Sequence, residues 1–300
     1  TERMRGGGIR PGDPAYERAR QVYNGMIDRH PALIARCADV ADVIAAVRSA
    51  VARDFLIAVR GGGHNAGGLG VCDDGLVIDL GGMRGIHVDP DARTARVEGG
   101  CVLGDVDHAT HAFGLAVPMG FISTTGIAGL TLGGGTGHLT RKLGLTIDSL
   151  LSADVVLADG RLVHANEREH EDLFWALRGG GGNFGVVTSF EFRLHPIDTV
   201  VAGPTFWPLE RAGELMRWYR EFILTAPEDL NGFFAYMTVP PVAPFPPELH
   251  GHKVAAIVWC WTGRAAAAAA AFAPVRAMAP AFFGVMPMPL PMPMPMPMPM

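Results

Sequence analysis

Three clusters of glycine limit what this chain can fold into more than any other feature of its sequence. They lie at residues 61–68, 126–137 and 179–185. Glycine makes up 39 of the 300 residues, against a usual share of roughly 7%. A residue without Cβ lets the backbone approach a ligand or another segment closely and adopt left-handed turns. The clusters therefore predict loops that bring backbone N–H groups to a binding site.

The first cluster, RGGGHNAGG at residues 60–68, follows directly on a predicted strand that ends at Val59. It contains more glycines than a hairpin turn requires, and successive amides in such a loop form a nest for an anion. This composition predicts a cradle for phosphate groups, to which Arg60 is expected to add a fixed positive charge. His64 lies inside the nest. Its position alone leaves two interpretations equally open, contact with the bound ligand or simple filling of the loop.

The second cluster, at residues 126–137, predicts a surface of small residues along which an extended planar ligand lies against the backbone. Close helix packing is the alternative explanation for glycine here. The third cluster contains a formal GxGxxG match at Gly180, Gly182 and Gly185. This match does not indicate a Rossmann dinucleotide site, because a helix is predicted before it and a strand after it, the reverse of that motif.

Markers of several other chemistries are missing from the sequence. It contains no Gly-Lys-Ser/Thr triplet of a P-loop and no GxSxG nucleophile elbow, so nucleotide hydrolysis and esterase activity are not expected. Asp105, Asp107, His108 and His111 lie close together in sequence. A predicted helix carries them, however, and such residues ordinarily occupy its exposed face, so no metal site is expected.

The pattern between residues 13 and 196 alternates helix and strand and predicts an α+β fold. A strand at 32–37, a helix capped by Asp39 and a strand at 56–59 form a β-α-β unit. Before it, a helix is expected with Asp13 as its N-cap, Pro14 at its first position and its end at Tyr23. The further expected elements are strands at 76–80, 94–98, 154–158 and 185–194 and a helix at 103–113.

The composition changes after Pro196, where glycine becomes rarer and aromatic residues more frequent, so a second domain is expected from about Val201. Some of these aromatic residues are candidates for an apolar substrate wall, but ordinary core packing is the favoured interpretation. They are Phe206, Trp207, Trp259 and Trp261. Residues 286–300 alternate Met and Pro with one exception. Because proline lacks a backbone N–H donor, this segment is expected to be disordered or a sequence artefact, and neither a helix nor an inner strand.

Charge and hydropathy exclude several classes of partner. The formal net charge is -5 and no run of Lys or Arg makes a basic surface, so neither nucleic acid nor an anionic membrane is an expected partner. No apolar run is long enough for a membrane span, and the first residues lack the apolar core of a signal peptide. The four cysteines have no CxxC spacing, and a cytoplasmic location is expected. Because Thr1 is not an initiator methionine, the sequence leaves open whether a segment precedes it.

Six motifs occur in a specific order along the first two thirds of the chain. They are PGDPxY at 11–16, NGMID at 24–28, VRGGGHN at 59–65, the glycine cluster at 126–137, RKLGLTxD at 141–148 and DLFWALRG at 172–179, which leads into GGGNFGVV. With these motifs the chain resembles bacterial FAD-linked oxidoreductases of the berberine-bridge-enzyme type, within the vanillyl-alcohol-oxidase superfamily. The resemblance is specific as far as Pro196 and continues weakly to about Pro289.

This resemblance implies a domain order. A two-lobed PCMH-type FAD-binding domain is expected at residues 1–200, with lobes at about 1–90 and 91–200. A partial α+β substrate domain is expected at 201–285, followed by the Met-Pro tail at 286–300.

The resemblance also implies how the cofactor is held. The FAD pyrophosphate is expected in the first glycine cluster, and His64 is expected to form a covalent bond to the 8α-methyl of the flavin ring. Such a bond withdraws electron density from the flavin and favours substrate oxidation. The cofactor-binding residues implied are Arg60, Gly61, Gly62, Gly63, His64, Asn65, Gly67, Gly68, Thr124, Gly126, Ala128, Gly129, Gly134, Gly137, Leu139 and Val187.

The chain departs from the family at two informative positions. Ile122 stands where doubly tethered relatives carry a cysteine that bonds to C6 of the flavin, so a single histidyl link without a 6-S-cysteinyl bond is expected. Ala66 stands where plant members place a tyrosine near the substrate. Plant-type alkaloid ring closure is therefore not expected.

The family continues for well over a hundred residues beyond the start of the Met-Pro tail. The chain is therefore expected to be truncated, and no catalytic residue is named because the usual base lies in that further region. The implied function is transfer of a hydride from an alcohol, a sugar or a secondary metabolite to covalent FAD, with reoxidation by O2 or another acceptor. The alternatives are a flavin-binding protein without turnover and a non-covalent NADPH-dependent reductase, against which His64 argues.

Overall fold

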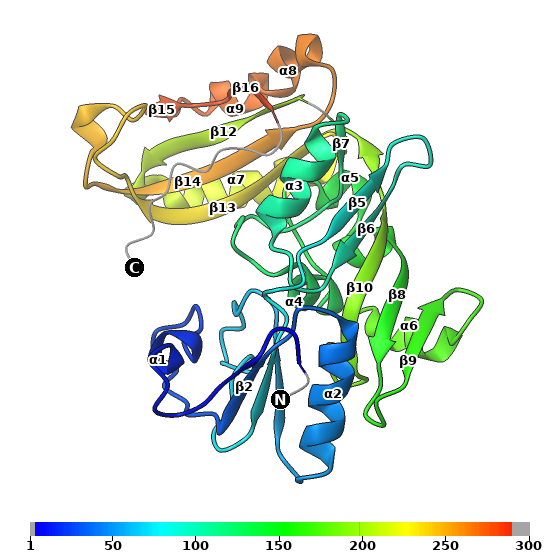
Figure 1. Cartoon of the computed structure of the whole chain (residues 1–300). Helices are drawn as coiled ribbons and strands as arrows, with labels where there is room; N and C mark the ends of the chain where they lie inside the picture. Colours follow the sequence, from blue (N-terminus) through cyan, green and yellow to red (C-terminus); the bar gives the residue numbers. More distant parts are fainter. Residues whose placement is uncertain (1–3, 198, 290–300) are drawn as a thin grey trace. The chain divides into compact units, whose positions relative to one another are not determined.

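Helices and strands alternate in the computed structural model, which describes residues 4–197 and 199–289 (Figure 1). The chain forms two compact units. The first runs to Thr136 and resumes from Leu145 to Pro196, and the second comprises Gly137–Gly144 and the chain from Ile197 onward. The mixture of helices and sheets confirms the predicted α+β class.

The first unit contains a four-stranded sheet in the order β1-β2-β4-β3. Its strands are β1 (Gly8–Ile9), β2 (Leu33–Arg36), β3 (Ile57–Arg60) and β4 (Leu76–Asp79). Strands β2 and β3 both pair with β4 in parallel, and helix α2 (Val40–Val51) connects β2 to β3. The predicted β-α-β unit is confirmed. Asp39 caps α2 as expected, because its side chain accepts a hydrogen bond from the Asp42 N–H at 3.0 Å.

The start of α2 is held to the N-terminal segment by the buried carboxylate of Asp42, which is 3% exposed. The backbone N–H groups of Arg5, Gly6 and Ala38 donate to it at 2.9, 2.9 and 3.0 Å. Burial alone would raise the pKa of this carboxyl, but the hydrogen bonds outweigh burial and hold the pKa below its ordinary value.

We expect Asp42→Ala to lower the free energy of unfolding by about 2–3 kcal/mol, because buried N–H groups lose their acceptor. Since folding lowers the pKa of Asp42, the stability that its charge contributes is fully present above the unfolded pKa of 3.8 and is lost as the pH falls through the folded pKa. Urea unfolding of the native protein and of Asp42→Asn checks this. The difference between them should shrink below pH 3.8, and a difference that stays constant in acid would contradict it.

A five-stranded antiparallel sheet in the order β5-β6-β10-β8-β9 forms the rest of the first unit's framework. Its strands are β5 (Ile86–Asp89), β6 (Thr94–Glu98), β8 (Leu150–Val156), β9 (Leu162–Asn166) and β10 (Val186–Arg193). Helices α3 (Leu103–His111), α4 (Ile127–Leu132) and α6 (Glu171–Leu177) accompany it. The helix before the third glycine cluster and the strand after it are both as predicted.

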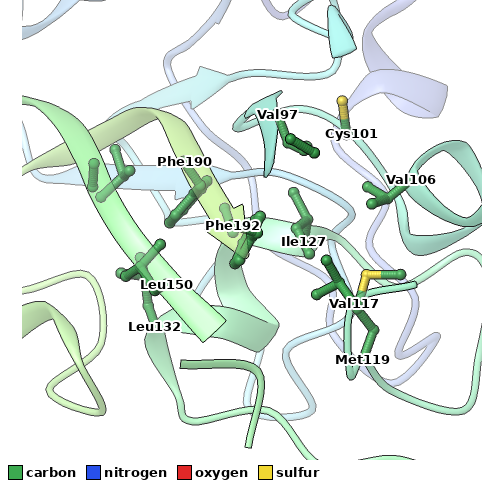
Figure 2. Close-up of a cluster of buried hydrophobic side chains, with 14 of the residues drawn as sticks. Val97, Cys101, Val106, Val117, Met119, Ile127, Leu132, Leu150, Phe190 and Phe192 are labelled. Atoms are coloured by element: carbon green, nitrogen blue, oxygen red, sulfur yellow. The ribbon is translucent and has the colours of Figure 1, made fainter. Parts of the chain in front are cut away.

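The largest core cluster of this unit joins the five-stranded sheet to α3 and α4. Phe190 and Phe192 of β10 lie among the side chains of Ile127 and Leu132 from α4 and Val106 from α3 (Figure 2). A second cluster joins α2 to both sheets, since Val156 and Val186 belong to it together with Val43 and Val47. The loops between these elements are therefore anchored on two apolar clusters.

The first helix is much shorter than predicted. Helix α1 covers only Tyr16–Ala19 and its N-cap is Ala15, not Asp13. The Asp13 carboxylate instead accepts the Arg10 N–H at 2.8 Å and closes a turn. The expected extension to Tyr23 is wrong because the Tyr23 N–H donates to the carbonyl of Gly63 at 3.0 Å, a long-range contact that no helix accommodates.

The second unit is built on one antiparallel sheet. Its order is β13-β14-β12-β15, and β16 also pairs with β12. The strands are β12 (Thr199–Pro208), β13 (Leu230–Thr238), β14 (Lys253–Trp261), β15 (Phe282–Phe283) and β16 (Met286–Pro289), and the helices are α5 (Thr140–Leu143), α7 (Ala212–Thr225), α8 (Ala265–Ala271) and α9 (Ala273–Ala277). The first unit also contains a two-stranded antiparallel sheet. It pairs β7 (Leu115–Ala116) with β11 (His195–Pro196).

The aromatic residues of the second unit pack in its core, as the favoured interpretation predicted. Trp207 and Trp259 are fully buried with α7, α8 and α9, and Trp261 belongs to the same cluster. Phe206 is fully buried in a cluster that includes Val254 and Ala256. These four side chains therefore stabilise the unit and do not form an exposed wall.

The first four residues of the Met-Pro segment form a strand. Residues Met286–Pro289 form β16, which pairs with β12 from Thr199 to Ala202. The expectation of disorder is therefore wrong for these four residues, because an edge strand tolerates proline where an inner strand would not. Residues 290–300 of the predicted tail lie outside the described residues. Across the part of the chain that the structure describes, no helix combines the length and the apolar character that a bilayer crossing needs.

Candidate active site

A cavity of about 680 Å³ lies in the first unit, within the size range of small-molecule sites. All three glycine clusters contribute to its wall. The lining residues are Ile57, Ala58, Val59, Arg60, Gly61, Gly62, Gly63, His64, Asn65, Leu69, Gly70, Leu80, Thr125, Gly126, Ala128, Gly129, Leu130, Leu132, Gly133, Gly181, Gly182, Asn183, Gly185 and Val187. Of these described residues only Arg60 and His64 have ionizable side chains, so no carboxylate repels an anion from the cavity.

The first glycine loop offers hydrogen-bond donors to this cavity. Strand β3 ends at Arg60, and Gly63 then takes a left-handed conformation with φ of +70°. Among the described residues, the N–H groups of Gly61, Gly62, Gly63 and His64 find no acceptor within the protein. Successive N–H groups without such an acceptor can form a concave site for an anion, and the phosphate cradle stays a prediction.

The first and second glycine clusters meet backbone to backbone. A Cβ added to Gly62 would lie 2.3 Å from the backbone N of Gly126, and a Cβ added to Gly126 would lie 2.3 Å from the backbone N of Gly62. Gly129, one turn further along α4, has nothing within 4 Å of an added Cβ. The second cluster thus packs closely against the first loop at Gly126 and leaves open space at Gly129. The planar ligand along its surface stays a prediction.

The side chain of Arg60 makes two contacts within the protein. Its Nη2 lies 2.9 Å from Oδ2 of Asp79, and its side chain is 8% exposed. Its Nη1 also donates to the carbonyl of Gln21 at 3.3 Å. The guanidinium therefore joins β3 to β4 beneath the glycine loop, and its charge is already paired with a carboxylate.

We expect Arg60→Ala to destabilise the protein even when no FAD is present, by about 3 kcal/mol, because the mostly buried Asp79 carboxylate loses its cation. Chemical unfolding of the FAD-free protein measures this, with the exposed Arg53→Ala as the control. Unchanged stability together with a large loss of FAD affinity would show instead that Arg60 serves the phosphates.

His64 is held by contacts on both ring nitrogens and on one ring face. Its Nε2 lies 3.0 Å from Oγ1 of Thr124, and its Nδ1 lies 3.4 Å from Oγ1 of Thr125. The Tyr23 ring stacks on it with centroids 4.0 Å apart and an interplanar angle of 19°. Burial lowers the pKa of His64 below its ordinary value of 6.5. The imidazole at the cavity wall is therefore neutral at pH 7 and can act as a nucleophile.

Part of the chain that forms this cavity matches a known protein family. Residues 31–166 match the FAD binding domain family. The match includes strands β2 to β4, the first two glycine clusters and His64, so most of the cavity wall lies within the matched region.

The chain also resembles proteins named as oxidases. The (R)-6-hydroxynicotine oxidase of Paenarthrobacter nicotinovorans is 40% identical over 200 residues, 66% of this chain and 44% of its own length. The structure of 6-hydroxy-D-nicotine oxidase from Arthrobacter nicotinovorans superimposes with a TM-score of 0.85 at 30% identity, over 96% of this chain and 62% of that one. The chain therefore spans less than two thirds of these proteins.

A third comparison concerns the flavin bond. The structure of glucooligosaccharide oxidase from Acremonium strictum, described as holding 6-S-cysteinyl, 8α-N1-histidyl FAD, has a TM-score of 0.80 at 26% identity. The match covers 95% of this chain and 59% of that one. Together these likenesses confirm the predicted fold class, a two-lobed FAD-binding fold followed by a further α+β unit.

The structure brings most of the sequence-predicted site residues together. Ten line the cavity, namely Arg60, Gly61, Gly62, Gly63, His64, Asn65, Gly126, Ala128, Gly129 and Val187, and Thr124 contacts His64. Three others do not line it. Gly67 lies beside Asn65, Gly68 packs on Ile27 with φ of +73°, and Gly134 turns the chain after α4 with φ of +105°. Gly137 and Leu139 belong to the second unit, so their contact with the cofactor stays a prediction.

The sequence-based site lacks residues that the cavity contains. Gly181, Gly182 and Asn183 of the third glycine cluster line it, although the order of helix and strand excludes a Rossmann motif there. Their glycine content was a usable signal, because a loop can form a cavity wall without that motif. For Tyr23 no local signal existed, since its stack on His64 joins segments far apart in the chain.

Proposed function

We propose that this chain is the FAD-carrying part of an oxidoreductase that oxidises a small organic substrate, an alcohol, a sugar or a secondary metabolite, with FAD bonded to His64. One observation carries the proposal. An imidazole held by two hydroxyl groups and a stacked ring lies in the wall of a glycine-lined cavity, most of which falls in the region that matches the FAD binding domain family. The likeness to proteins named as oxidases supports the reaction class.

The residues present fit an FAD molecule. The unpaired N–H groups of residues 61–64 suit the pyrophosphate, and Gly129 leaves open space beside them. Bound FAD would supply an acceptor for a hydride, which carries two electrons. The protein's part is to hold the dinucleotide against the rigid pair of Gly62 and Gly126, to present a neutral imidazole at His64 and to keep carboxylates away from the phosphates.

We propose a single tether to the flavin. Isoleucine at position 122 has no sulfur to bond with the ring, so His64 alone would retain the cofactor. The 8α-N1-histidyl bond described for glucooligosaccharide oxidase supports the histidyl half of this arrangement. A permanent bond would raise the flavin potential and favour oxidation of substrate, with O2 or another acceptor reoxidising the flavin.

Anaerobic reduction tests the reaction. We expect an alcohol or sugar from a broad panel to bleach the flavin absorbance of the purified protein, and air to restore it. If no substrate bleaches the flavin while dithionite does, the chain is a flavin-binding protein without turnover. Rapid bleaching by NADPH, with flavin that acid releases, would identify a non-covalent reductase instead.

A further inference from the structure

Tyr23 is tied to the glycine loop through its backbone, so its ring has a fixed place. Its N–H donates to the carbonyl of Gly63 at 3.0 Å, and Nδ2 of the adjacent Asn24 donates to the carbonyl of Ala66 at 2.8 Å. The ring remains 50% exposed while it stacks on the His64 imidazole. The core therefore does not account for its position. Its ring packs on one face of His64.

Thr124 is fixed from the other side of the site. Its carbonyl oxygen would lie 3.1 Å from a Cβ on Gly62, so its backbone packs against the first glycine loop. It also belongs to a turn in which the Thr125 N–H donates to the carbonyl of Ile122 at 3.0 Å. The Thr124 hydroxyl reaches Nε2 of His64 at 3.0 Å, whereas Thr125 reaches Nδ1 only at 3.4 Å. The shorter bond is the stronger one.

From these contacts we propose that Tyr23 and Thr124 are positioning residues for the bond between His64 and the flavin. Tyr23 fixes the plane of the imidazole. Thr124 accepts the proton of Nε2 in a hydrogen bond, which leaves the lone pair on Nδ1, the nitrogen that bonds to the flavin. This inference rests on the tether proposed above and names the residues that prepare it.

The step balances with O2 as the oxidant. The C–N bond forms from the Nδ1 lone pair to the flavin methyl carbon, and one C–H bond of that methyl breaks. The methyl proton and the Nε2 proton are released, and the two electrons of the C–H bond enter the flavin. O2 then takes these two electrons with two protons and gives hydrogen peroxide. The lowered pKa of His64 supports this step, because only the neutral ring has a free lone pair.

The first test follows the covalent bond over time. Protein purified from riboflavin-starved cells is mixed with FAD in air, and acid-quenched samples are assayed for flavin fluorescence on a denaturing gel. We expect Thr124→Val and Tyr23→Leu to slow attachment by roughly 10-fold to 100-fold, as misplacement of a reacting group does. Tyr23→Phe keeps the ring and should attach FAD at the native rate. Ser123→Ala removes an exposed neighbouring hydroxyl and is the matched control.

The pH profile separates positioning from simple support of the fold. The attachment rate should rise with pH as His64 loses its proton, with a midpoint below 6.5 in the native protein. Tyr23→Leu uncovers the imidazole and should move this midpoint up. A merely structural role for Tyr23 would leave the midpoint unchanged.

The second test needs no cofactor. Nitrogen-15 NMR of the FAD-free protein reports the tautomer of His64, whose signals are identified by their absence in His64→Gln. We expect the Nε2–H tautomer in the native protein and a mixture in Thr124→Val. A native Nδ1–H tautomer would overturn the role of Thr124.

The outcomes distinguish this inference from the proposed function. If the native chain attaches FAD and the Tyr23 and Thr124 variants match its rate, the positioning role is wrong and the tether stands. If the variants lose non-covalent FAD binding as well, Tyr23 and Thr124 form part of the FAD-binding site itself, and the inference is wrong. If the native chain binds FAD without bonding to it, the tether fails, and the inference with it.

Discussion

The His64→Ala variant is expected to fold, to bind FAD and to release all of it into acid. The imidazole contacts Thr124, Thr125 and Tyr23 at the cavity wall, and none of these contacts joins sheets or helices of the core. Its removal should therefore change stability by less than about 1 kcal/mol. The unpaired N–H groups of residues 61–63 remain to hold the pyrophosphate.

The comparison is made by acid precipitation of native and variant protein after reconstitution with FAD. Flavin should stay with the native pellet and appear in the supernatant of His64→Ala. His30→Ala, at an exposed histidine away from the cavity, is the control and should retain its flavin. Flavin that stays bound to His64→Ala would place the covalent bond elsewhere.

Gly62→Ala should destabilise the fold and weaken FAD binding together. Its new methyl group would lie 2.3 Å from the backbone N and 2.7 Å from Cα of Gly126, atoms that cannot rotate away as a side chain can. The two glycine loops would have to separate, which we expect to cost about 3 kcal/mol of stability. The distorted cradle should also bind FAD roughly 100-fold more weakly, a further 2.7 kcal/mol or so.

Gly129→Ala is the matched control, because nothing lies within 4 Å of its added Cβ and it sits inside α4. Its urea midpoint should equal or exceed that of the native protein, since alanine favours helix. Urea unfolding of the FAD-free variants and titration with FAD measure the two effects separately. Equal stability of Gly62→Ala and Gly129→Ala would show that the loops can separate at little cost.

Local sequence patterns were sufficient for much of the fold. Asp39 marks the start of α2 because a short polar side chain before an apolar helical stripe is an N-cap signal, and the structure has that hydrogen bond. The strands around the glycine clusters follow from runs of branched apolar residues. The same reasoning failed for Asp13, because the following segment is pulled to the glycine loop by a contact with Gly63.

The site was harder to predict where it depends on distant pairs. Arg60 beside a glycine nest suggested a phosphate contact, but its partner Asp79 becomes its neighbour only once β3 and β4 pair in parallel. The contact of Gly62 with Gly126 and the stack of Tyr23 on His64 likewise join segments far apart in the chain. Sequence patterns carry no register between such segments, so these features needed the structure.

Peptide mapping of the denatured holoprotein tests the central claim most directly. Cleavage after Arg60 and Arg84 gives one peptide, residues 61–84, in which His64 is the sole histidine. We predict that this peptide carries the mass of one FAD, with fragment ions that place it on His64. An unmodified peptide together with all the flavin in the acid supernatant would contradict the account.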